Sequence, residues 1–199
     1  MGSKVITRIT IGLKAAALSA FMSFAGTVNA ADYVIDTKGS HAFVQFRVMH
    51  LGYSWLYGRF NEFSGEFTYD AEAPEKASIM VDIQTPSVDS NHAERDKHLR
   101  GEKFLDVEQF PTAKFESTRV EVISETEAKV FGNLTLKDVT KEVVLDVERV
   151  GMGPDPWGGY RVGFEGRTKF RMKDFNIMRD LGPLSQDVEM ILTVEGIKK

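Results

Sequence analysis

The stretch RVGFEGRTKFRMK, residues 161–173, alternates between apolar and charged side chains, and this alternation decides the fold class. Its even-numbered positions include Val162, Phe164, Thr168, Phe170 and Met172. Its odd-numbered positions include Arg161, Glu165, Arg167, Lys169, Arg171 and Lys173. Successive side chains of a β-strand point to opposite faces of its sheet. The stretch therefore predicts a strand with one buried face and one face in water.

The same alternation recurs along the rest of the chain. The predicted strands cover residues 42–49, 77–84, 128–136, 141–150, 161–173 and 187–195. Residues 58–70 and 112–123 are also strand-like, but their alternation changes phase partway, so we expect bulges there. About eight strands in one span, with no linker or repeat, predict an antiparallel barrel or sandwich. We favour the barrel because closing the sheet removes its exposed edges.

The first 30 residues have the pattern of a secretory signal peptide. Lys4, Arg8 and Lys14 precede an uncharged, mostly apolar run over residues 15–28, and Ala30 closes a cleavage-like site. A membrane anchor is the alternative, but the uncharged run is shorter than the ~20 residues needed to span a bilayer. We therefore predict cleavage after Ala30 and one exported domain, residues 31–199, that is not anchored in the membrane.

Charge and cysteine content exclude several function classes. Taking the three leader cations from the 25 basic residues leaves 22, against 29 acidic residues, for a net charge of −7. Such a surface would repel nucleic-acid phosphates, so we expect no nucleic-acid partner. The chain has no cysteine, so neither disulfides nor thiol chemistry is available to it.

One polar segment predicts a helix instead of a strand. Asn91 is a suitable N-cap and Gly101 a suitable stop, which places the helix over residues 92–100. Only Ala93 and Leu99 are apolar within it. Such a helix cannot form part of a core, so it must lie on the surface or across an opening.

The helix also carries the chain's best candidates for chemistry. His92 and Asp96 share one face of the helix, and Glu94 and His98 share another. A metal-dependent or hydrolytic envelope enzyme using His92, Asp96 and His98 is therefore an alternative function. No Gly-x-Ser-x-Gly, phosphate loop or dinucleotide fingerprint occurs in the sequence. We expect no catalytic residues, no metal and no cofactor, and a ligand-free protein-interaction module is a further alternative.

The predicted strand length bears on what the barrel contains. An eight-stranded barrel is either filled by its own side chains or able to hold one small ligand. Strands of about twelve residues, tilted by roughly 40°, make a barrel ~30 Å tall, which suits a long, thin, apolar ligand. The aromatic loop HLGYSWLYG, residues 50–58, is either a packed turn or a rim around the mouth of such a cavity.

Several stretches, in this order and spacing, resemble the YceI family of bacterial periplasmic lipocalin-like proteins. They are ADYVID (31–36), HAFVQFRVMHLGYSWLYGRF (41–60), SVDSNHAERDKHLR (87–100), FPTAKF (110–115), GNLTLKDVTKEV (132–143), DPWGGYRVGFEG (155–166) and RMKDFNIMRDLGP (171–183). Many members have Asp-Phe-Gly where this chain has Asp174-Phe175-Asn176. Since Asn also tolerates positive φ, we expect a variant of the same turn.

The resemblance implies an all-β fold, an extended eight-stranded antiparallel lipocalin-like barrel with one short surface helix. It also implies a periplasmic location, a long apolar cavity, an isoprenoid lipid ligand such as a polyprenyl phosphate or a ubiquinone-like molecule, and a possible homodimer. On this hypothesis the polar helix is a lid over the barrel mouth. The predicted ligand-binding residues are Arg95, His98 and Arg100 for the head group, and Phe46, Val48, Val81, Ile83, Leu134, Phe164, Phe170, Met190 and Leu192 for the tail.

Overall fold

The computed structural model describes residues 1–2 and 30–199. The predicted signal peptide lies almost wholly outside these residues. The strands are β1 (Ala31–Ile35), β2 (Phe43–His50), β3 (Ser54–Phe60), β4 (Phe63–Tyr69), β5 (Ser78–Gln84), β6 (Val88–Asp89), β7 (Thr112–Val122), β8 (Glu127–Leu136), β9 (Val139–Pro154), β10 (Tyr160–Arg171) and β11 (Asp187–Lys198). The helical elements are α1 (Ala93–Arg100) and the 3-10 turns η1 (Pro74–Lys76), η2 (Thr85–Ser87) and η3 (Met172–Phe175).

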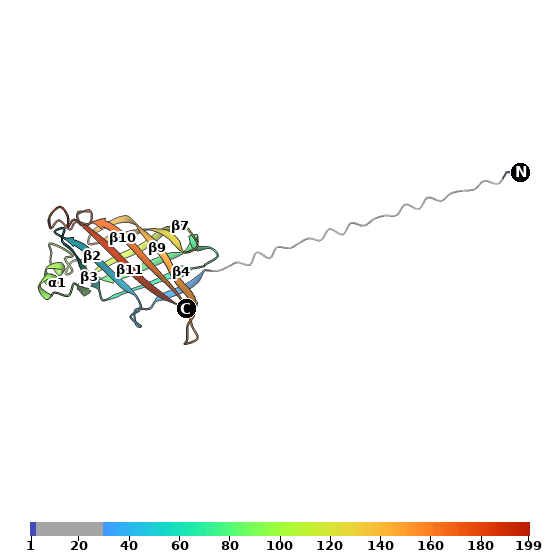
Figure 1. Cartoon of the computed structure of the whole chain (residues 1–199), viewed down its shortest axis with the longest axis horizontal. Helices are drawn as coiled ribbons and strands as arrows, with labels where there is room; N and C mark the ends of the chain where they lie inside the picture. Colours follow the sequence, from blue (N-terminus) through green and yellow to red (C-terminus); the bar gives the residue numbers. More distant parts are fainter. Residues whose placement is uncertain (3–29) are drawn as a thin grey trace.

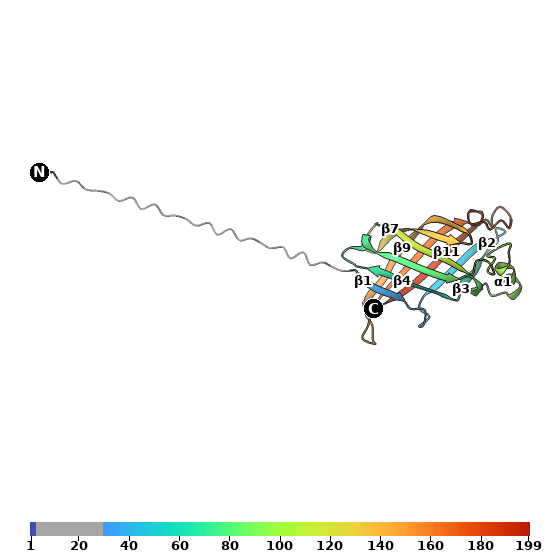
Figure 2. The same ribbon diagram turned by 180° about the vertical axis from the view of Figure 1, so that it is seen from behind.

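The strands form a closed antiparallel barrel (Figure 1). Eight strands follow one another in the order β1-β4-β5-β7-β8-β9-β10-β11, and β11 returns to β1. Towards one end, β2, β3 and β6 continue the wall, since β11 also pairs with β2, β2 with β3 and β3 with β6. The predicted eight-stranded barrel with one helix is confirmed. Figure 2 shows the barrel from behind, with α1 at one end.

Both places where the alternation changes phase are irregular in the structure. In β7 the pairing with β8 shifts register between Ser117 and Arg119, so the predicted bulge is confirmed. Over residues 58–70 the strand instead breaks at residues 61–62. The break lets β3 pair with β2 and β6 while β4 pairs with β1 and β5. The expectation of a bulge within one continuous strand was wrong at this position.

The helix and the strand predicted over residues 161–173 each differ slightly from expectation. Helix α1 is capped by the ring of His92, whose Nδ1 accepts from the Arg95 N–H at 3.2 Å. The predicted cap, Asn91, has a φ of 60° and precedes the helix. Strand β10 ends at Arg171, and the turn η3 follows it. Asn176, the residue directly after η3, has a φ of 55°. The expected turn variant is therefore confirmed, because Asn occupies a left-handed position there.

Aromatic rings cover three glycines on the inner face of the barrel. Phe46 lies over its cross-strand partner Gly58. Phe115 of β7 covers Gly132 of β8, and Phe67 of β4 covers Gly196 of β11. A Cβ atom at any of the three glycines would overlap the ring. Glycine in a strand interior destabilises the strand, because it has no side chain to pack against its neighbours. An aromatic ring packed over the glycine restores these packing contacts.

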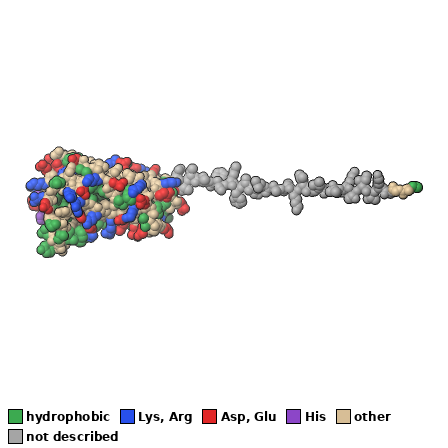
Figure 3. All heavy atoms as spheres, turned by 90° about the horizontal axis from the view of Figure 1, so that it is seen from above, with side chains coloured by type: hydrophobic (Ala, Val, Ile, Leu, Met, Phe, Trp, Pro, Cys, Tyr) green, Lys and Arg blue, Asp and Glu red, His purple; other side chains and the backbone are tan. Residues whose placement is uncertain are grey.

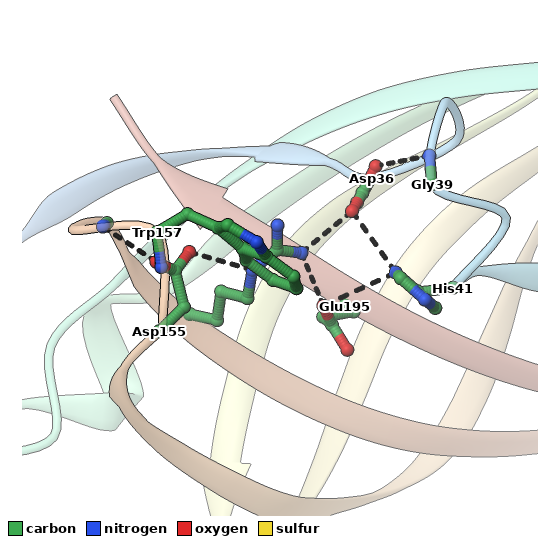
Figure 4. Close-up of polar contacts among 8 residues, drawn as sticks. Asp36, Gly39, His41, Asp155, Trp157 and Glu195 are labelled. Atoms are coloured by element: carbon green, nitrogen blue, oxygen red, sulfur yellow. Dashed lines mark hydrogen bonds and ion pairs between the residues drawn. The ribbon is translucent and has the colours of Figure 1, made fainter.

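A partly buried ion-pair network closes the barrel seam between β1, β10 and β11 (Figure 4). Arg161 donates to Asp36 at 2.7 Å, to Asp155 at 2.9 Å, and to Glu195. The Arg161 hydrogen bond holds the pKa of the Asp36 carboxyl below its ordinary value, with the Gly39 N–H contributing further. The network thus joins the end of β1 to β11 and to the turn between β9 and β10.

We expect Gly58→Ala to destabilise the fold by about 1–3 kcal/mol, because the new methyl group displaces the Phe46 ring from a packed position. Urea unfolding followed by circular dichroism measures the change. Gly151→Ala is the matched control: nothing lies within 4 Å of a Cβ at that strand position, so its effect should stay within about 0.5 kcal/mol. Equal effects of the two substitutions would contradict the covering role of Phe46.

We expect Asp36→Asn to lower stability at neutral pH and to lose this effect in acid. Because the folded pKa of Asp36 lies below the ordinary value of about 3.9, its stabilisation is complete above that pH and disappears as the pH falls through the folded pKa. Urea unfolding of both proteins from neutral pH down to about pH 3 tests this. A stability difference that is constant with pH would refute it. Asp32→Asn is the control, because Asp32 is exposed on β1, the strand that Asp36 directly follows.

Candidate ligand-binding cavity

The barrel encloses an apolar cavity of about 910 Å³ that extends to the end covered by α1. Its wall is made by inward-facing side chains of the long strands, because alternation directs every second residue inward. Ten of the twelve predicted binding residues line it. They are Phe46, Val48, Val81, Ile83, Arg95, His98, Leu134, Phe170, Met190 and Leu192.

The other two predicted residues lie elsewhere. Phe164 faces a second, smaller cavity and packs edge-on against Phe67 and Tyr69, with ring centroids 5.7 and 5.1 Å apart. Arg100 donates to the backbone carbonyls of Pro86 at 2.8 Å and Val88 at 2.6 Å. Its guanidinium group therefore fastens α1 to the barrel wall, and Arg100 is not among the residues that line the main cavity.

A polar network fixes the start of α1 beside the cavity mouth. The buried Asp96 carboxylate accepts from the Ser90 N–H at 2.8 Å and from the Ser90 hydroxyl at 2.5 Å. Arg95 donates to the Ser90 hydroxyl at 2.7 Å and to the Ser90 carbonyl at 2.6 Å. Lys97, His98 and Arg95 itself contribute to the cavity lining. The helix thus places basic side chains in the lining of the mouth, while its buried acidic residue, Asp96, accepts hydrogen bonds from Ser90.

The mouth includes residues that the sequence reasoning did not select. The loop between β10 and β11 contributes Ile177, Arg179 and Leu181, and the segment after α1 contributes Lys103 and Leu105. These residues lie outside the regular strands, so no alternation pattern marks them. For Lys103 and Leu105 the available signal was their position directly after the predicted helix.

The aromatic loop of residues 50–58 forms part of the rim. Its residues His50, Leu51 and Leu56 line the cavity, while Tyr53 is 87% exposed. The Leu51 N–H donates to the Ser185 hydroxyl at 3.3 Å, which joins the β2–β3 turn to the β10–β11 loop. Exposed hydrophobic side chains gather at this end of the molecule, at the left of Figure 3.

The structure brings one group of potential metal ligands together within the described residues. Donor atoms of Asp36, His41 and Glu195 lie within 4.8 Å of one another. Arg161 already supplies positive charge to both carboxylates there. Figure 4 shows His41 beside the same two carboxylates. His92, Asp96 and His98 do not form such a group in the described part of the chain: His92 caps α1 and Asp96 accepts from Ser90.

Among residues 1–2 and 30–199, no helix has the length and apolar character needed to cross a membrane.

Comparisons with known proteins agree with this architecture. A UPF0312 protein from Azotobacter vinelandii is 54% identical over 187 residues, which is 94% of this chain and 97% of that protein. The YceI protein of Campylobacter jejuni has a similar solved structure, with a TM-score of 0.70 and 28% identity, covering 76% of this chain and 90% of that one. A polyisoprenoid binding domain from Saccharophagus degradans shares the fold, with a TM-score of 0.63 and 15% identity, covering 85% and 99% of the two chains.

A protein-family model also matches most of the chain. The model of the YceI-like domain matches residues 33–196, which is nearly the whole of the described barrel. The chain therefore belongs to the YceI family.

Proposed function

We propose that this protein binds a long-chain isoprenoid lipid, a polyprenyl phosphate or a ubiquinone-like molecule, in its main cavity. The observation that carries the proposal is the apolar cavity of about 910 Å³ with nitrogen donors gathered at its mouth. The polyisoprenoid binding domain of Saccharophagus degradans, which has the same fold, supports this ligand class. The protein acts by binding and carrying the lipid, and we propose no catalytic step.

The energetics of the cavity support a ligand-binding role. The side chains that line a space of about 910 Å³ lack dispersion partners on their inner side unless a guest fills it. The walls, lined by residues such as Phe170 and Leu192, offer water few hydrogen-bond partners. A long hydrocarbon chain satisfies both requirements, because it fills the volume and demands no polar contact.

The charges around the mouth favour an anionic head group. The lining includes Arg95, Lys97, Lys103 and Arg179, against one acidic residue, Glu102. The chain as a whole is acidic, with a formal net charge of −4, so this local excess of cations departs from the general surface. Charge-assisted hydrogen bonds to a phosphate are stronger than those to a neutral quinone. We therefore propose polyprenyl phosphates as the preferred ligands.

The location of the protein is part of the same proposal. The basic and apolar pattern of residues 1–30 supports export to the periplasm with cleavage after Ala30. A lipid tail crossing that aqueous space needs shielding from water, which an enclosed barrel provides. We retain the homodimer implied by the family resemblance as a further proposal, which light scattering of the purified protein would test.

We expect Val81→Trp to weaken the binding of octaprenyl phosphate by at least about 100-fold, because the indole would occupy the space of the tail. Leu192→Trp should act in the same way from the opposite wall. Met80→Trp is the matched control, since Met80 is the exposed neighbour of Val81 on the same strand. Equilibrium binding and circular dichroism are measured for each variant. Unchanged binding by the two inward variants, with the fold intact, would place the tail elsewhere.

We expect Arg95→Gln to weaken octaprenyl phosphate binding about tenfold while leaving octaprenol, which has no charge, unaffected. Arg100→Gln is the control on the same helix, because Arg95 lines the main cavity and Arg100 does not. It should leave the ratio of the two affinities unchanged. The proposal of a phosphate head group fails if Arg95→Gln weakens both ligands equally.

A further inference from the structure

A second cavity, of about 120 Å³, lies inside the barrel beside the first. Four apolar residues line both cavities: Ile79, Leu145, Leu192 and Val194. The two spaces therefore share part of their walls. The second cavity also reaches the turn between β7 and β8, where its lining includes residues 124–127.

The residue order along the strands shows that the second cavity continues the first along the barrel. On β10 the inward row passes from Phe170 and Thr168, which line the main cavity, to Gly166 and Phe164, which line the second one. Strands β7, β8 and β9 show the same order from the mouth inward, with Leu145 of β9 at the transition. A lipid tail entering at the mouth would meet Gly166 where the second cavity begins, opposite Leu192, which lines both cavities.

Gly166 lies at the transition between the two cavities. Its cross-strand partners are Leu192 and Val147. A Cβ atom at Gly166 would meet Leu192 at 3.6 Å and Val147 at 3.8 Å, which are ordinary contact distances. This differs from Gly58, whose inner side is filled by the Phe46 ring. The space that a side chain at Gly166 would occupy is therefore part of the cavity system.

We propose that the second cavity binds the far end of the lipid tail, and that Gly166 keeps the passage to it open. This inference rests on the proposed function and specifies its ligand class: a prenyl chain long enough to fill the main cavity and continue past Gly166. A short prenyl chain ends within the main cavity and gains nothing from the second one. Each buried methylene raises affinity by roughly fourfold, before the entropy lost in ordering the tail is subtracted. A tail that reaches the second cavity therefore binds more tightly than one that does not, so the second cavity selects for chain length.

The test compares farnesyl phosphate with octaprenyl phosphate, which share a head group and differ in tail length. Gly166→Leu places a side chain in the passage, and Val147→Phe fills the second cavity from β9 without changing a glycine. Gly163→Leu is the matched control on β10: Gly163 alternates with the inward residues and faces away from the cavities. Circular dichroism confirms folding, and equilibrium binding gives the affinity of every variant for both ligands.

We expect both inward variants to weaken octaprenyl phosphate binding by at least about tenfold while farnesyl phosphate binding stays within about twofold. Gly163→Leu should change neither affinity. If octaprenyl phosphate binds all folded variants as tightly as the unchanged protein, the tail does not enter the second cavity, and the proposed function stands without this inference. If neither phosphate binds the unchanged protein, the proposed function fails, and the inference fails with it.

Discussion

Closure of the sheet through β11 is the constraint on which the rest of the structure depends. This strand pairs with β10 along almost its whole length, with β2 towards the α1 end and with β1 at the other end. A closed sheet has no free edge, and its inner face becomes an interior separated from water. The Asp36 N–H donates to the Glu195 carbonyl at 2.8 Å where β1 leaves β11, and Arg161 joins both residues. The ion pairs thus hold the seam at the point where the strand partner changes.

Much of this fold could be predicted because period-two alternation reports directly on a two-faced sheet. The row from Val162 to Met172 is inward-facing as expected, with Val162 fully buried. The break at residues 61–62 could not be predicted, because it depends on which strands β3 and β4 pair with, and pairing is a tertiary property. The cap of α1 was misassigned for a related reason. Asn91 adopts a left-handed conformation, and its N–H donates to Asp89.

The candidate site was predictable in kind but not in detail. Alternation identifies inward residues, yet it cannot distinguish those that face a cavity from those that pack on neighbours. Phe164 and Phe170 are both phenylalanines on the inner face of β10, but only Phe170 lines the main cavity. Phe164 instead packs on two aromatic rings of β4. Arg95 and Arg100 both donate to backbone carbonyls, but they lie at different positions around α1, and only Arg95 lines the main cavity.

The contrast among the inner glycines connects the fold to the cavity. At Gly58, Gly132 and Gly196 the missing side chain is replaced by an aromatic ring from another strand, so the interior is filled there. At Gly166 no ring takes its place: the nearest atoms belong to Leu192 and Val147, at ordinary contact distances. Filling this position as well would stabilise a packed barrel, since close-packed interiors gain dispersion contacts. A hollow at this point therefore costs stability, and a hydrocarbon tail passing Gly166 would supply the contacts that the chain itself omits.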